Sequence, residues 1–486
     1  MFLRISRRLR FVLFIIGLGL LPPGVAVSDP SPTRVSAPIA VFPLHNATGA
    51  AEWDWISIGL QDSLTVDLWY VSALQTKALS QMTEAVQAVC PDVTLTCIAR
   101  QDRATWQAQA KTLSDGGFLW GEYRRDGETW VLRLGWYNLE EDAPLAEQTV
   151  RGASLPVLLA ASTAGLQAML AARGIPVTDA EQARMTAPKT TVATAWEQNA
   201  RGYWAQIRWG LAADEAESTA RAAVWEQHLR AAVEAGPDYA EAWNNLGWQR
   251  YVLKAYGDAA SPTSSPINAR LAFQQALRHK PALIDALMGQ GATLQALDRV
   301  ADALPWYEQA VALNPSLTHH RETLLAAYQA AEQPEAGLAS LAKLDTHLER
   351  SGREDERTAL YAWRIAYHTA LKQWPQVLAA YRAWDAVLAT QTDEAHREQR
   401  LELAEQLYAL GEERQTADAW PDAEAAHRLA LAIREAIHGP DHLDVASSLN
   451  NLGLVLNAQG RYTEAEQVLR RILGILEKTL GPEHLD

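Results

Sequence analysis

Residues 281–315 read PALIDALMGQGATLQALDRVADALPWYEQAVALNP, and this stretch decides the fold of the chain. Pro281 and Pro315 lie 34 residues apart, with Gly291 in the first half and Tyr307 in the second. A glycine lets one helix cross another closely, a large aromatic ring fills the wedge between them, and a proline stops the second helix. The stretch therefore predicts a pair of helices that stacks on neighbouring pairs as a solenoid.

The 34-residue period, the residue sizes and the final proline resemble the tetratricopeptide repeat (TPR) family. The resemblance implies a concave groove, which in this family usually holds a peptide or helix of a partner protein. A preceding copy follows Pro237 and carries the residues that we predict to bind a partner: Asn244, Asn245, Trp248 and Tyr251. Packing on the neighbouring helix is the alternative role for the two aromatic residues.

The repeat period changes near the C-terminus. Seven positions between Leu410 and His442 recur 42 residues later, including Gly439-Pro440 as Gly481-Pro482. This pattern resembles the longer repeat of kinesin light chains. The last predicted helix, 463–480, carries more apolar residues than one partner helix covers: Val468, Leu469, Ile472, Leu473, Ile475, Leu476 and Leu480. We therefore expect a homodimer through this end, or further repeats beyond it.

Residues 38–174 alternate between strand and helix patterns. Apolar runs predict strands at 39–43, 73–77, 118–125, 129–137 and 145–150, and Asp126-Gly127 predicts a tight hairpin. Apolar periodicity predicts helices at 52–70, 80–89, 98–114 and 155–173.

The runs 39–49 and 53–64, with Gly117–Gly121, resemble the N-terminal domain of TolB and its relatives. Those relatives are often fused to adenylate-cyclase domains and to TPRs. The resemblance implies an α/β domain with a mixed sheet. Because no part of this sequence corresponds to the cyclase, the catalytic activity of such fusions is not expected here.

The N-terminus reads as an export signal. Four arginines at positions 4–10 precede an apolar run, 11–21, and small residues before Asp29 fit a cleavage site. Cleavage would send the protein to the periplasm or another exported location, whereas an uncleaved segment, 11–27, would anchor it in the inner membrane. The two cysteines, Cys90 and Cys97, predict a disulfide in that oxidising compartment, with a redox-active pair as the alternative.

These patterns together predict an α/β N-terminal domain followed by an all-α TPR solenoid. The predicted organisation is a signal peptide at 1–28, a linker at 29–37, the TolB-like domain at 38–174, a connector at 175–198, repeats of 34 residues or degenerate form at 199–394, and 42-residue repeats at 395–486.

Composition and motifs favour binding over catalysis. The formal net charge of −15 gives little means of neutralising phosphates, so nucleic acid is not an expected partner. No nucleophile, zinc-protease or phosphate-loop signature occurs, so we predict no cofactor, no metal and no enzymatic activity. His438 and His442 flank a glycine-proline turn, for which a turn-capping role is expected. We predict a scaffold for proteins or peptides of the envelope, with a ligand-sensing signalling component as the alternative.

Overall fold

The computed structural model describes residues 38–76, 79–92, 94–113, 116–256, 267–391 and 393–480. The predicted signal peptide and linker lie outside these ranges. The chain divides into two compact units, of which the first ends at Ala331 and the second begins at Glu332. Each unit is described by itself below.

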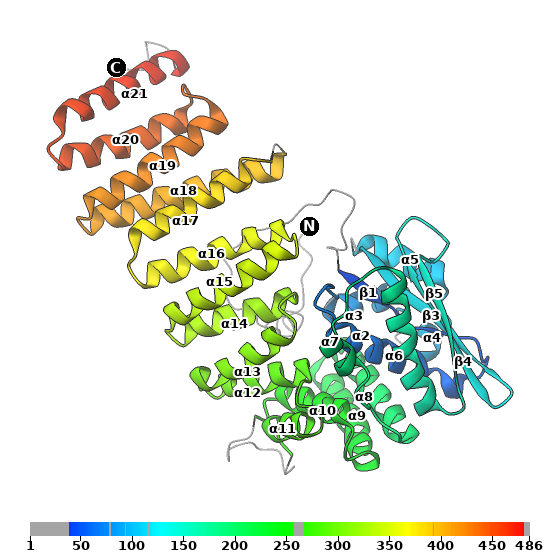
Figure 1. Ribbon diagram of the computed structural model, residues 1–486. Coiled ribbons are helices and arrows are strands. Elements are labelled where there is room, and N and C mark those ends of the chain that lie inside the picture. Colours follow the sequence, from blue (N-terminus) through cyan, green and yellow to red (C-terminus); the bar gives the residue numbers. More distant parts are fainter. Residues whose placement is uncertain are drawn as a thin grey trace. The chain divides into compact units, whose positions relative to one another are not determined.

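The chain carries a small mixed sheet followed by many helices (Figure 1). In the first unit the elements are β1 (Ile39–Val41), β2 (His45–Asn46), η1 (Ala51–Trp53), α2 (Trp55–Leu68), α3 (Leu79–Val89), α4 (Leu95–Ala99), α5 (Arg103–Thr112), β3 (Gly117–Asp126), β4 (Thr129–Tyr137), β5 (Ala146–Gly152), α6 (Leu155–Ala172), α7 (Asp179–Met185), α8 (Ala193–Gly210), α9 (Glu215–Ala235), α10 (Ala240–Val252), α11 (Ala269–His279), α12 (Ile284–Ala296), α13 (Val300–Leu313) and α14 (Thr318–Ala330). In the second unit they are α15 (Pro334–Arg350), α16 (Glu354–Ala370), α17 (Trp374–Leu388), α18 (Glu394–Thr416), α19 (Trp420–His438), α20 (Leu443–Ala458) and α21 (Tyr462–Leu480).

The sheet has the order β1-β3-β4-β5, and β2 also pairs with β3. β1 and β2 run parallel to β3, whereas β3–β4 and β4–β5 are antiparallel. Gly127 turns the β3–β4 hairpin with a φ of 62°, a conformation that favours glycine. One face of β4 is buried, because its alternate residues are each at most 4% exposed: Trp130, Leu132, Leu134 and Trp136.

Helix α6 packs on β4 and β5. By length and composition it could cross a membrane, but part of it forms the core of the domain, with buried leucines such as Leu158 and Leu166. Gly152 of β5 and Gly165 of α6 allow the helix to approach the sheet closely. A Cβ built at Gly152 would lie 2.4 Å from the backbone nitrogen of Leu158.

The repeats of the first unit pair as α8–α9, α10–α11 and α12–α13. The small and large residues of the sequence pattern meet as predicted. A Cβ built at Gly291 would lie 2.5 Å from the ring of Tyr307, and one at Gly247 would lie 2.6 Å from the ring of Phe273. These glycines therefore set the distance between the two helices of a pair.

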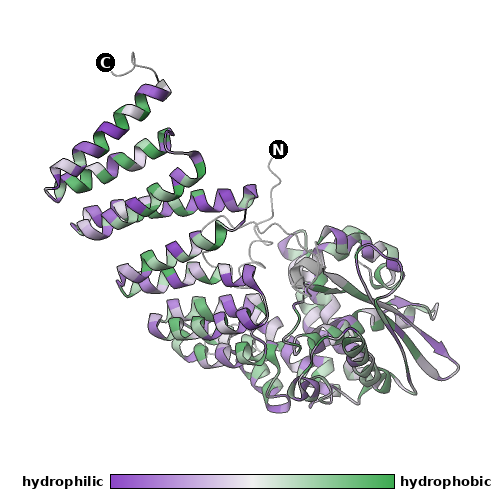
Figure 2. Ribbon diagram, turned by 45° about the horizontal axis from the view of Figure 1, so that its top comes forward, coloured by the Kyte–Doolittle hydropathy of each residue, from purple (hydrophilic) through white to green (hydrophobic). Residues whose placement is uncertain are grey.

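The helices of the second unit pack in sequence order, and hydrophilic and hydrophobic residues alternate along them (Figure 2). One core cluster joins α17, α18 and α19, with Leu403 and Leu407 almost fully buried. A second cluster joins α19, α20 and α21 around Leu449 and Ile475.

The predicted fold class is confirmed: a small mixed-sheet region precedes a long helical-repeat region. The predicted strand at 73–77 is wrong over its described residues, since only Thr76 forms a bridge, to Ile39. The predicted connector, 175–198, contains α7 and the start of α8.

Candidate functional site

The α/β domain packs directly on the first repeat helix. A Cβ built at Gly59 of α2 would lie 3.0 Å from Cβ of Ala200 and 3.2 Å from Nε1 of Trp196, both on α8. The rings of Trp55 and Trp196 meet edge to face, with centroids 5.1 Å apart. Because all these side chains are buried, α2 and α8 belong to one continuous core.

A second contact joins the segment after α2 to the turn between α13 and α14. Nδ2 of Asn314 donates a hydrogen bond to the carbonyl oxygen of Trp69 at 2.7 Å. Nε2 of Gln75 donates to the carbonyl oxygen of Ser316 at 3.2 Å, and Oγ of Ser316 donates to the carbonyl oxygen of Ser72. Two of these hydrogen bonds satisfy the carbonyl oxygens of Trp69 and Ser72, so residues of the α13–α14 turn help to hold the turn that follows α2.

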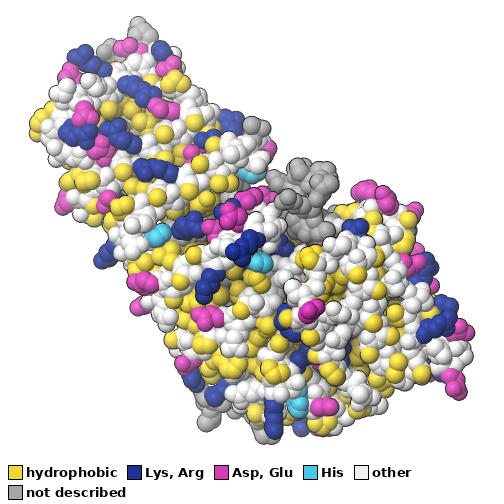
Figure 3. Space-filling view, in the orientation of Figure 1, with side chains coloured by type: hydrophobic (Ala, Val, Ile, Leu, Met, Phe, Trp, Pro, Cys, Tyr) yellow, Lys and Arg dark blue, Asp and Glu magenta, His cyan; other side chains and the backbone are white. Residues whose placement is uncertain are grey.

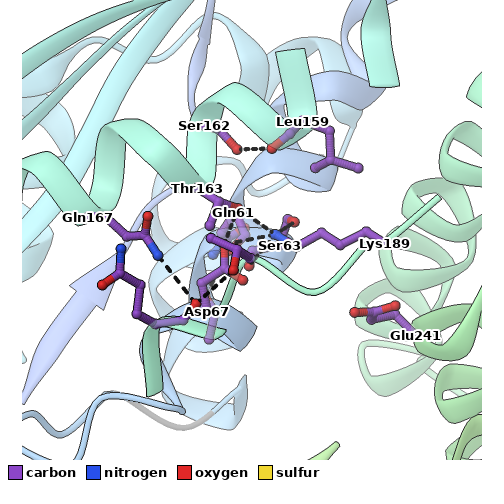
Figure 4. A network of polar contacts seen from close by, with 12 residues as sticks. Gln61, Ser63, Asp67, Leu159, Ser162, Thr163, Gln167, Lys189 and Glu241 are labelled. Carbon is purple, nitrogen blue, oxygen red and sulfur yellow. Dashed lines mark hydrogen bonds and ion pairs between the residues drawn. The ribbon is translucent and has the colours of Figure 1, made fainter. Parts of the chain in front are cut away.

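A buried lysine from the segment before the first repeat helix makes a third contact with the α/β domain, shown in Figure 4. Lys189, from the segment before α8, points its ammonium group at α2 and α6. Nζ lies 2.8 Å from Oδ2 of Asp67, 2.6 Å from Oγ of Ser63 and 3.1 Å from Oγ1 of Thr163. The side chains of Lys189 and Asp67 are 6% and 0% exposed, so each charge depends on the other.

The four predicted partner-binding residues lie together on α10. Nδ2 of Asn244 and Nε1 of Trp248 each donate to Oδ2 of Asp285 on α12, both at 2.7 Å. Nδ2 of Asn245 donates to Oδ1 of Asn199 on α8 at 3.0 Å. This polar row links the first helices of three successive repeats.

The two aromatic members are half-buried. The ring of Trp248 contacts the rings of Tyr251 and Phe273 edge to face, with centroids 5.5 and 5.3 Å away. Tyr251 also contacts Tyr256. Both residues thus take part in packing, and their role in binding a partner stays a prediction.

Sequence reasoning missed two carboxylates beside this row. Burial raises the pKa of Asp285 to about 6, against the hydrogen bonds from Asn244 and Trp248 that lower it. Burial, together with Glu241 and Asp285, raises the pKa of Asp62 on α2 to about 7. Neither residue belongs to a recognisable motif, and only the docking of α2 on the repeats brings them together.

The cysteine prediction is confirmed, because Cys90 and Cys97 form a disulfide between the end of α3 and α4. The predicted cap is also present: Nδ1 of His442 accepts a hydrogen bond from the backbone nitrogen of Asp444 at the start of α20. His438 stacks on His442, and with Asp444 they place three candidate metal-ligand atoms within 4.8 Å of one another.

The surface of the second unit carries a cavity and several exposed apolar side chains. A cavity of about 380 Å³ lies between α17 and α19, lined by Arg382, Pro421, Glu424, Ala425, Arg428, Leu429 and Ala432. Figure 3 shows Lys and Arg side chains among hydrophobic ones on these C-terminal helices. Several large apolar residues of α20 and α21 are exposed: Leu443, Leu454, Tyr462, Leu469 and Leu473.

Comparison with known proteins identifies part of the repeat region. Residues 403–478 match the model of the tetratricopeptide repeat family, and no curated protein matches the chain. A putative kinesin light chain of Podosopora anserina with nearly identical TPR-like repeats is a similar solved structure. It is 20% identical, with a TM-score of 0.25, over 41% of this chain and 97% of that one.

A human IFIT1 dimer with m7Gppp-AAAA is 11% identical, with a TM-score of 0.27, over 89% of this chain and 98% of that one. The resemblance of residues 38–174 to the TolB domain stays a prediction. The family match identifies residues 403–478 of this chain as tetratricopeptide repeats.

Proposed function

We propose that this protein is a non-enzymatic scaffold, exported to the cell envelope, that binds other proteins or peptides through its repeats. The observation that carries this proposal is the exposure of large apolar side chains on the C-terminal repeat, where Tyr462, Leu469 and Leu473 are 69%, 51% and 48% exposed. Repeat helices normally bury such residues against a neighbour, so we expect this face to be covered by a partner protein, a second copy of the chain or a further repeat.

Capture of proteins from an envelope extract tests the proposal. Leu469→Glu combined with Leu473→Glu should reduce capture by the full-length protein at least about tenfold, because each change places a charge where an apolar contact is expected. Gln467→Glu is the control for added charge, since it places one negative charge, half the change of the double variant, at an exposed position of the same helix. Equal capture by all three proteins would contradict a docking role for this face.

The predicted groove residues provide an independent arm of the same experiment. Trp248→Ala combined with Tyr251→Ala should weaken capture if these rings contact the partner, with helical content unchanged by circular dichroism. Unchanged capture would leave both residues with the packing role that their ring contacts already show.

The same apolar face favours a homodimer through the C-terminal repeat. Light scattering of the Leu469→Glu, Leu473→Glu variant should then report a monomer where the unaltered protein is a dimer. Export itself is tested by the mass of the mature chain, which should begin near Asp29; retention of residues 11–27 would indicate an inner-membrane anchor instead.

A regulatory role related to cyclase-associated TolB–TPR proteins is the second candidate. It is favoured by the shared core of α2 and α8, because a ligand that shifts α2 would act directly on the first repeat. Partner capture that changes when a ligand of the N-terminal domain is added would support this candidate over a passive scaffold.

A further inference from the structure

Two histidines and an aspartate meet at the turn between α19 and α20. His438 is the last residue of α19, His442 caps α20, and Asp444 lies in the first turn of α20. Nε2 of His438 lies 3.5 Å from Oδ2 of Asp444, and Nδ1 of His442 lies 3.4 Å from the same oxygen. One candidate ligand atom of each residue thus lies within 4.8 Å of those of the other two.

The backbone of the turn brings the two rings together. Gly439 ends α19 with a φ of 87°, a conformation that favours glycine, and Pro440 follows it. The ring of His442 then stacks on that of His438, with centroids 4.3 Å apart. Because the glycine-proline pair interrupts the helix between the two histidines, their spacing in the sequence does not predict this meeting.

Comparison of the two 42-residue repeats separates the roles of the three residues. Histidine and aspartate recur 42 positions after His442 and Asp444, whereas the position of His438 is taken by Leu480. The repeat turn therefore does not require a histidine before its glycine. His442 already has a role in the turn, because its Nδ1 accepts a hydrogen bond from the backbone nitrogen of Asp444. His438 adds a third potential ligand to a pair that belongs to the repeat.

The charges around the turn leave the three residues open to a cation. Of the described residues, only the two imidazoles pair with the carboxylate of Asp444. The basic side chains close to the turn have acidic partners of their own: Arg434 with Glu405, Arg471 with Glu435, and Lys478 with Asp441. The C-terminal end of α19 favours a cation and the N-terminal end of α20 disfavours one, so the effects of the two helix ends largely offset each other.

The donor atoms and their spacing indicate which metal fits. Two ligand atoms that each lie about 2.0 to 2.1 Å from a tetrahedral Zn²⁺ are about 3.4 Å apart. The two nitrogen–oxygen distances at the turn, 3.5 and 3.4 Å, match this spacing. Imidazoles with a carboxylate suit transition metals such as Zn²⁺, whereas Ca²⁺ and Mg²⁺ prefer ligand sets made of oxygen. His442 and Asp444 are 46% and 54% exposed, so an ion can reach them from solvent.

We propose that His438, His442 and Asp444 bind a divalent transition-metal ion of the Zn²⁺ class, with water in the fourth position. Nδ1 of His442 exchanges its hydrogen bond with the backbone of Asp444 for the metal, and its exposed ring has room to turn out of the stack. The ion ties the end of α19 to the start of α20 and so stabilises these repeats. The site does not depend on the docking role proposed above.

Calorimetric titration of the full-length chain, purified without a histidine tag, tests the site with Zn²⁺. His438→Leu should raise the dissociation constant about tenfold or more, because even a group that only supports a metal ligand is typically worth tenfold. Asp444→Asn should weaken binding in the same way, and Mg²⁺ should not compete with Zn²⁺. Zn²⁺ should also raise the melting temperature of the unaltered protein more than that of His438→Leu.

His438→Leu is expected to fold, because the next repeat has leucine at the same position. His396→Leu is the matched control: it removes a histidine of α18 that pairs with one carboxylate, that of Asp393, and it should leave the dissociation constant unchanged. Zn²⁺ binding that is the same in His438→Leu and the unaltered protein, or that is weakened equally by His396→Leu, would overturn the proposal. Displacement of Zn²⁺ by an equal concentration of Mg²⁺ would also overturn it.

Discussion

Asp62 should make the stability of the first unit depend on pH. Its pKa is raised from 3.8 to about 7 by burial and by Glu241 and Asp285, against the opposing charge of Lys189, while Tyr203 beside it stays neutral. The folded protein therefore holds this proton more tightly than the unfolded chain. This contribution to stability is complete below about pH 4 and is lost as the pH rises through about 7.

Asp62→Asn cannot ionise, so it should raise the free energy of unfolding at pH 8 by about 1 to 3 kcal/mol, a range reduced for partial exposure. At pH 4 the variant and the unaltered protein should unfold alike. Urea unfolding at both pH values measures the difference, with Asp298→Asn as the exposed control. A difference that is the same at pH 4 and pH 8 would show that Asp62 ionises normally.

At the scale of single residues, the contacts that were predicted correctly from the sequence are those between residues close together in the chain. The disulfide between Cys90 and Cys97 and the cap by His442 follow from residues close together in the chain. Asp62 and Asp285 are 223 positions apart in the sequence, and their neighbourhood arises only when α2 packs on the repeats. Nothing in one sequence marks such a pair.

At the scale of helices, glycine positions determine how closely a repeat pair packs. Gly247→Ala should destabilise the first unit by about 1 to 3 kcal/mol, because the added Cβ would lie 2.6 Å from the ring of Phe273. Gly210→Ala is the control: it is also helical, but nothing lies within 4 Å of its added Cβ. That change should be neutral or stabilise by up to about 1 kcal/mol.

Thermal unfolding followed by circular dichroism measures both glycine variants. If the two changes have the same effect, the close helix crossing is not what stabilises the repeat. The contrast also shows why the helices were predictable from the sequence. The spacing of small and large residues indicates which faces pack together, whereas the turn after α2 is held by hydrogen bonds to the distant residues 314–316, which the local sequence does not reveal.

At the scale of the whole chain, the contacts of α8 determine where the chain can be cut into stable fragments. The sequence suggests a boundary near Gly174, because residues 175–198 are rich in small and polar residues. In the structure Trp196 and Ala200 cover Trp55 and Gly59, and Lys189 neutralises the buried Asp67. A fragment ending at Gly174 would leave this surface of α2 open to solvent and one buried charge without its partner.

We therefore expect the fragment 38–331 to unfold cooperatively and the fragment 38–174 to be much less stable, with a lower melting temperature and stronger binding of a hydrophobic dye. Losing the partner of a charge that stays buried costs about 3 to 5 kcal/mol, and this is an upper value here because the opened surface of α2 admits water to Asp67. Asp67→Asn in the short fragment should recover part of that loss, since it removes the unpaired charge, whereas the same change in 38–331 should destabilise by leaving Lys189 unpaired. Equal melting temperatures for the two fragments would show that the α/β domain is stable without the repeats.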